Sequence, residues 1–154
     1  MKEGAQAEAK KLDIKLITAS GKADGDTASQ ITALENCLQK NPDINVIYTI
    51  NEPAAAGAFN ALQKAKKTGV TIVSVDGGCQ GIKDTAKGVI AATSQQYPLK
   101  MASMGVQAGA EYAKSGKKAT GYVDTGVTLI ANKAIKGVDS KDTKVGADLC
   151  WGKK

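Results

Sequence analysis

The apolar positions of the chain repeat at two spacings, one typical of helices and the other of strands. Residues 2–11 carry apolar side chains at helical intervals, and residues 14–18 form a β-rich run that predicts a strand. A polar loop at 21–26 is followed by a second predicted helix, because Asp26 can cap its first turn. That helix is expected to end at about Lys40.

The alternation continues to about Lys114, and after Gly116 the pattern breaks into short β segments. The further predicted strands are 44–50, 70–75 and 89–92, and short β segments are predicted at 121–124 and 127–131. The further predicted helices follow Pro53, Gly78 and Pro98, and the helix after Pro98 reaches about Lys114. The tail from residue 133 is polar and is predicted to be irregular.

Strands and helices that alternate with short links predict an α/β fold. We expect a flavodoxin-like lobe of four or five mostly parallel strands with helices on both faces. The strand order is expected to reverse beside the first strand. The length of 154 residues suits a single lobe with one hydrophobic core.

The composition narrows the possible functions. Net charge is +6, yet all 21 basic residues are lysines scattered along the chain, which is typical of a solvated surface and not of a nucleic-acid site. The chain contains no histidine, which removes the commonest general base and the commonest zinc ligand. No apolar run approaches the ~20 residues that a membrane span requires, and the first residues show no signal-peptide pattern. We expect no cofactor, no metal and no nucleic-acid partner.

Polar side chains follow three of the predicted strands. Asn51, Asp76 and Gln96 supply two amides and one carboxylate at the carboxyl ends of these strands, where parallel sheets bind their ligands. A carboxylate accepts hydrogen bonds from neighbouring hydroxyls, and an amide both donates and accepts. This set suits a polyol, although asparagine and aspartate also follow strands simply as caps and turns.

Three sequence segments resemble a known family. YTINEPAAAGA at 48–58, VSVDG at 73–77 and IAATSQQYP at 90–98 are similar to the second lobe of the ribose/galactose-type periplasmic sugar-binding proteins of ABC transporters. DLCWG at 148–152 is similar to the fructose-binding branch. Residues 36–154 resemble the second lobe, whereas residues 1–35 resemble a segment of the first lobe. We therefore expect one lobe assembled from parts of two.

The resemblance implies a function and a site. It implies that Asn51, Asp76 and Gln96 contact a pentose or hexose, with fructose favoured by the closest branch, and that a permease is the transport partner. It implies a periplasmic location and a protein that is not an enzyme. A lone lobe encloses one side of its ligand, so we expect weak binding. An uncovered sheet edge would also favour a homo-oligomer.

Two alternatives remain open. The chain could be a half-domain that binds no sugar, or a dimerising scaffold. The segment from Gly77 to Gly81 also resembles the nucleophile turn of a hydrolase with Cys79 as the nucleophile, but that chemistry needs a histidine base. Cys37, Cys79 and Cys150 permit one disulfide or three thiols, and the sequence does not choose between them.

Overall fold

The computed structural model describes residues 2–23 and 26–153 of the chain. It divides into two compact units, Met1–Ser74 and Val75–Lys154. The division falls inside one strand, β2 (Thr71–Asp76), whose last two residues belong to the second unit. Both units contain helices and strands, so the predicted α/β class is confirmed.

The described residues of the first unit form three helices and two parallel strands, the second of which continues into the other unit. The elements of the first unit are α1 (Lys2–Lys11), α2 (Thr27–Lys40), β1 (Val46–Tyr48), α3 (Glu52–Lys64) and the first part of β2. The register of β1 and β2 places Val46 opposite Thr71 and Tyr48 opposite Val73. Helices α2 and α3 pack against each other. The buried apolar side chains of this unit are Leu38, Ile47, Ala55, Ala58, Ala61, Leu62 and Ile72.

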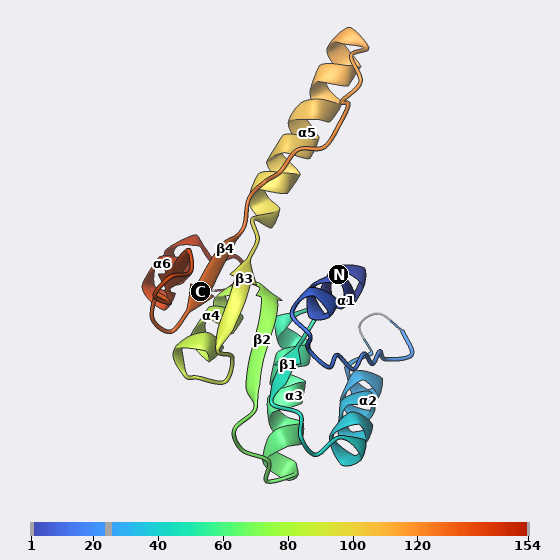
Figure 1. Cartoon of the computed structure of the whole chain (residues 1–154). Coiled ribbons are helices and arrows are strands. Elements are labelled where there is room, and N and C mark those ends of the chain that lie inside the picture. Colours follow the sequence, from blue (N-terminus) through green and yellow to red (C-terminus); the bar gives the residue numbers. More distant parts are fainter. Residues whose placement is uncertain (1, 24–25, 154) are drawn as a thin grey trace. The chain divides into compact units, whose positions relative to one another are not determined.

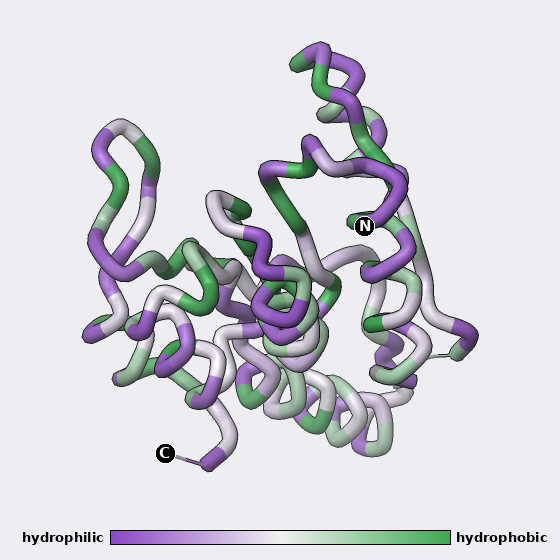
Figure 2. The backbone as a smooth tube through the Cα atoms, turned by 90° about the horizontal axis from the view of Figure 1, so that it is seen from below, coloured by the Kyte–Doolittle hydropathy of each residue, from purple (hydrophilic) through white to green (hydrophobic). Residues whose placement is uncertain are grey.

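Local sequence signals set the helix starts in this unit. The carboxylate of Asp26 accepts a hydrogen bond from the backbone N–H of Ser29 at 3.0 Å, which caps α2 as predicted. Residues 24 and 25 of the predicted loop lie outside the described residues. Pro53 lies in the first turn of α3, where its missing N–H leaves no bond unmade. Figure 2 shows hydrophobic and hydrophilic residues alternating along the helical segments, the pattern that gives a helix an apolar side to bury.

The second unit contains the end of β2 and six further elements. These are α4 (Cys79–Ala86), β3 (Ala92–Gln95), α5 (Pro98–Ser115), β4 (Thr128–Ala131), β5 (Ser140–Asp142) and α6 (Thr143–Leu149). β3 is antiparallel to β4, whereas β4 and β5 are parallel. Both α4 and α6 pack against β4. A Cβ atom on Gly146 would lie 2.9 Å from Cγ2 of Ile130, so the glycine lets α6 approach β4 closely.

Helix α5 is the most exposed element of the second unit. It has no buried residue, and Figure 1 shows it extending away from β3 and β4 while the segment after it runs back alongside. Lys100 Nζ donates to the carbonyl oxygen of Thr125 at 3.1 Å, which ties the helix to that returning segment. Among the described residues, no helix combines the length and apolar character needed to cross a membrane.

The prediction of a strand at residues 14–18 is wrong. These residues form no strand, and the apolar side chains of Ile14, Leu16 and Ile17 are exposed. A strand needs a neighbour to satisfy its backbone N–H and C=O groups, and a β-rich sequence alone does not supply one. The expected reversal of strand order beside this segment therefore does not arise.

Further differences lie in the second unit. The strand predicted at 89–92 forms at Ala92–Gln95, residues 121–124 form no strand, and the tail is not irregular because it contains β5 and α6. Asp142 caps the first turn of α6, the helix that was not predicted. Its Oδ1 atom accepts from the backbone N–H groups of Lys144 and Val145, both at 3.1 Å. Parallel pairing still prevails, in β1 with β2 and in β4 with β5. The antiparallel pair of β3 and β4 was not predicted.

Candidate functional site

Two of the three predicted site residues lie together in the second unit. Asp76 is the last residue of β2, and Gln96 follows the last residue of β3. The Nε2 atom of Gln96 donates to Oδ1 of Asp76 at 2.8 Å. The backbone N–H of Gln96 also donates to the carbonyl oxygen of Asp76 at 3.0 Å. These two bonds hold a carboxylate and an amide at one end of the two strands, as the sequence predicted.

The backbone of Asp76 adopts a conformation that few residues other than glycine take. Its φ is 129°, which lies in the positive region. Gly77 follows with a φ of 73°, and a Cβ atom there would lie 2.2 Å from Cγ of Gln95. The turn after β2 therefore requires glycine at position 77, both for its backbone angle and for its close approach to β3. Such strain costs about 1–3 kcal/mol at a residue like Asp76 and often marks functional sites.

Gln95 anchors this turn from inside the unit. Its side chain is fully buried, and its Nε2 atom donates to the carbonyl oxygens of Gly77 and Gly146, both at 3.1 Å. Two acceptors of this kind fix the orientation of the amide, because only the nitrogen can donate to them. Its Oε1 atom has no hydrogen-bond partner among the described residues. Successive residues of a strand point to opposite faces, which gives Gln95 a structural role and leaves Gln96 at the site.

Two aromatic residues are connected to the Asp76–Gln96 pair, Tyr97 because it follows Gln96 in the chain and Trp151 through a hydrogen bond to Asp76. Tyr97 and Trp151 both line a cavity of about 200 Å³ together with Pro98, Leu99, Lys100 and Leu149. The indole Nε1 atom of Trp151 donates to the carbonyl oxygen of Asp76 at 3.1 Å. Trp151 lies in the tail, far from Asp76 in the sequence. Its direct bond to Asp76 was not predicted.

The structure decides the pairing of the three cysteines. Cys79 and Cys150 form a disulfide, whereas Cys37 is a free thiol. Cys79 is buried, and its sulfur is bonded to another sulfur, so it cannot be the nucleophile of a hydrolase. The glycines around it instead permit the tight turn from β2 into α4.

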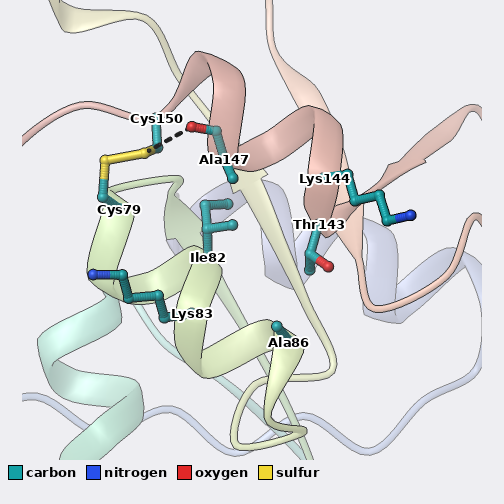
Figure 3. A pocket seen from close by; sticks show the side chains of 8 residues that line it. All are labelled: Cys79, Ile82, Lys83, Ala86, Thr143, Lys144, Ala147 and Cys150. Atoms are coloured by element: carbon teal, nitrogen blue, oxygen red, sulfur yellow. Dashed lines mark hydrogen bonds between the residues drawn. A yellow bond between two sulfur atoms is a disulfide. The ribbon is translucent and has the colours of Figure 1, made fainter. Parts of the chain in front are cut away.

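The disulfide lines a second cavity of the unit, of about 310 Å³, between α4 and α6. Figure 3 shows Ile82 and Ala147 on its walls and the two sulfur atoms at one end. The Sγ atom of Cys150 lies 3.3 Å from the carbonyl oxygen of Ala147, a contact without a proton because the sulfur is oxidised. The walls are mostly apolar, and neither Asp76 nor Gln96 belongs to them. This cavity is therefore separate from the candidate site.

Asn51, the third predicted site residue, lies in the first unit. It is the N-terminal cap of α3, and its Oδ1 atom accepts from the backbone N–H of Ala54 at 2.9 Å. This is the capping role that asparagine often has after a strand. Its Nδ2 group is the part of the side chain that could donate to a ligand. A contact between Asn51 and a ligand stays a prediction.

Sequence reasoning missed the roles of Gln95 and Trp151, and it left open whether a disulfide forms and between which cysteines. The adjacent glutamines at 95 and 96 were a usable signal, because period-two alternation in a strand predicts one buried and one accessible side chain. Trp151 and Cys150 lie more than 70 residues from their partners Asp76 and Cys79. No local pattern indicates such pairings.

Comparisons with known proteins identify the family. A family described as periplasmic binding protein domain matches residues 1–118. The chain is 33% identical over 106 residues to the ribose import binding protein of Salmonella typhimurium, covering 69% of this chain and 36% of that protein. It is 36% identical over 113 residues to the D-allose-binding periplasmic protein of Escherichia coli, covering 73% of this chain and 36% of that protein. The chain thus spans about a third of the length of these relatives.

Solved structures show the same fold. A galactofuranose binding protein matches with a TM-score of 0.78 and 21% identity, covering 96% of this chain and 49% of that chain. A solute binding protein from Agrobacterium vitis bound with alpha-D-tagatopyranose also has a TM-score of 0.78, at 20% identity, covering 98% of this chain and 49% of that chain. The relatives are binding proteins by name. From the family match and these relatives, the chain belongs to the family of periplasmic binding protein domains.

Proposed function

We propose that the chain binds a monosaccharide through Asp76 and Gln96. The observation that carries this proposal is the pair of hydrogen bonds that joins these two residues at the ends of β2 and β3. The pair presents a carboxylate, which has several acceptor positions, and an amide oxygen that accepts from a further hydroxyl. Trp151 is bonded to the carbonyl oxygen of Asp76 and Tyr97 follows Gln96 in the chain, which supports these two aromatic rings as surfaces for the C–H groups of a sugar ring.

The names of the relatives support a pentose or a hexose as the ligand. They include ribose import binding proteins and a D-allose-binding protein. We propose fructose as the favoured hexose because of the sequence DLCWG at 148–152. In the whole protein, the bound sugar would be delivered in the periplasm to the permease of an ABC transporter. Asn51 would be a third contact through its Nδ2 group.

Binding by the chain alone should be weak. Each exposed hydrogen bond contributes about 0.5–1.5 kcal/mol, because water competes for the same hydroxyl. Three such bonds give roughly 2–4 kcal/mol, which corresponds to a millimolar dissociation constant at best. The test is therefore an NMR titration in which ribose, allose and fructose are each added to concentrations of tens of millimolar.

Matched aspartate variants test the site. Asp76→Asn removes the charge but keeps the shape, and asparagine tolerates a positive φ. We expect it to weaken binding about tenfold, because bonds to a charged acceptor are about twice as strong as neutral ones. Asp139→Asn removes the same charge at an exposed position of the same unit and should leave binding unchanged. Equal binding by both variants, or micromolar binding by a monomer, would contradict the proposal.

One observation favours self-association as a second candidate function. Val46 and Tyr48 of β1 are 56% and 50% exposed, and Ile50, just after the strand, is 58% exposed. Apolar side chains gathered on an exposed strand commonly mark an interface. We propose that β1 meets a second copy of the chain. Light scattering at micromolar concentrations should show a dimer for the natural sequence and a monomer for Val46→Lys, and a monomeric natural sequence would rule the dimer out.

A further inference from the structure

The carbonyl group of Asp76 is held from two directions. It accepts from the backbone N–H of Gln96 at 3.0 Å and from the indole Nε1 of Trp151 at 3.1 Å. A carbonyl oxygen has two lone pairs, so both are in use. The peptide plane that follows Asp76 is therefore fixed, although the φ of this residue is one that the chain would otherwise avoid.

Trp151 is itself held by the turn that follows β2. The backbone N–H of Cys79 donates to the carbonyl oxygen of Trp151 at 2.9 Å, and Gly78 and Trp151 form a parallel bridge. The preceding residue, Cys150, is bonded covalently to Cys79. The segment after α6 is thus attached to the same short stretch of chain that carries Asp76.

We infer that Trp151, held by the Cys79–Cys150 disulfide, is a positioning residue that keeps the Asp76 carboxylate in its sugar-binding conformation. This inference rests on the proposed function of Asp76 and Gln96. Without the indole bond, the strained backbone of Asp76 gains freedom to relax toward more populated angles. Its carboxylate then leaves the place beside Gln96 for a larger fraction of the time, which lowers the affinity for the sugar.

The arrangement makes the site sensitive to thiol reductants. Reduction by a dithiol breaks the bond between the two sulfurs, and Cys79 and Cys150 each gain one electron and one proton as the reductant closes into its own disulfide. Cys79 is buried, whereas Cys150 is partly exposed, so attack begins at the sulfur of Cys150. Opening this bond removes the covalent attachment of the segment around Trp151, which then has only hydrogen bonds and side-chain packing to hold it.

The first test needs no sugar. Trp151 is the single tryptophan of the chain, so its indole N–H gives one unambiguous NMR signal. We expect this proton to exchange slowly with water in the oxidised protein and about tenfold faster or more after dithiothreitol, and we expect the amide signals of Asp76 and Gln96 to shift. The Cys37→Ser background removes the free thiol as a second target. Unchanged exchange and unchanged amide signals on reduction would overturn the inference.

The second test compares affinities for D-ribose. Trp151→Phe keeps a ring and the disulfide but removes the N–H donor, and we expect it to weaken binding about three- to tenfold, the loss of one hydrogen bond. Reduction of the Cys37→Ser protein should weaken binding by a similar factor. If the Trp151 bond and the disulfide were merely structural, removing them would lower the unfolding temperature but leave the dissociation constant of the folded protein unchanged. That result would contradict the inference. Absence of ribose binding in the oxidised protein would refute the proposed function, while the indole exchange rate still decides the positioning of Asp76.

Discussion

Gln96 is bonded to Asp76 twice, once through its backbone N–H at 3.0 Å and once through its side-chain Nε2 at 2.8 Å. The backbone bond connects the ends of β2 and β3, so it fixes the distance between the two residues. The side-chain bond then orients the carboxylate. A ligand group that bonds to both side chains therefore finds them already arranged, and it spends less free energy on ordering them.

The side-chain bond of Gln96 should contribute to stability as well as to binding. Gln96→Leu removes the Nε2 donor while the backbone bond remains, and hydrogen bonds to charged groups contribute about 1.5–3 kcal/mol. We expect the free energy of unfolding in urea to fall by that amount. Gln80→Leu is the matched control, because Gln80 makes the same kind of bond to Asp84 at 3.0 Å on the exposed surface of α4. An exposed helical pair contributes only about 0.2–0.5 kcal/mol. An equal loss of unfolding free energy in the two variants would therefore contradict the stabilising role of the Gln96 side-chain bond.

Gly77 should tolerate no side chain. Gly77→Ala places a Cβ atom 2.2 Å from Cγ of Gln95 and keeps a backbone φ of 73° that alanine disfavours. Overpacking and backbone strain together should destabilise the protein by about 2–4 kcal/mol. Gly88 has nearly the same φ, 77°, with nothing near its Cβ position. Gly88→Ala should therefore cost only about 1 kcal/mol, and the difference between the two unfolding transitions measures the contact with Gln95.

The disulfide should stabilise the second unit substantially. Cys79 and Cys150 are 71 residues apart in sequence, and closing a long loop restricts the unfolded chain. Replacing both by serine should lower the free energy of unfolding by about 2–4 kcal/mol. Cys37→Ser removes a cysteine that makes no disulfide and should change stability by less than about 0.5 kcal/mol. A double serine variant as stable as the natural sequence would show that the bond does not form in solution.

The cap of α2 should make the first unit sensitive to acid. Hydrogen bonds from the backbone and side chain of Ser29 hold the pKa of Asp26 below its usual value of 3.8. Because the pKa is lower in the folded state than in the unfolded state, the stabilisation is complete well above pH 3.8 and is lost as the pH falls toward and through the lowered pKa of the folded state. Asp26→Asn keeps a good capping side chain without a titrating group. The free energy of unfolding, measured with urea between neutral pH and pH 3, should therefore decrease less with falling pH for this variant than for the natural sequence. Equal decreases for the two proteins would contradict the assigned cap.

The sequence by itself determined the features whose causes lie within a few residues. The helix after Asp26, the proline turn at Pro53 and the helix after Pro98 all form as predicted, because caps and first turns involve neighbours three or four positions away. The pairing of Asp76 with Gln96 could be predicted because each follows a strand, and parallel strands end at the same edge of a sheet.

Only the tertiary structure decided the features that need a distant partner. Residues 14–18 have a strand-like sequence but form no strand, because backbone pairing depends on a neighbour that local sequence does not specify. The bond from Trp151 to Asp76 spans 75 positions, and the disulfide spans 71. The energy of such contacts depends on distance in space and not on separation in sequence. For that reason the residues that hold the candidate site in place emerged only once the chain was folded.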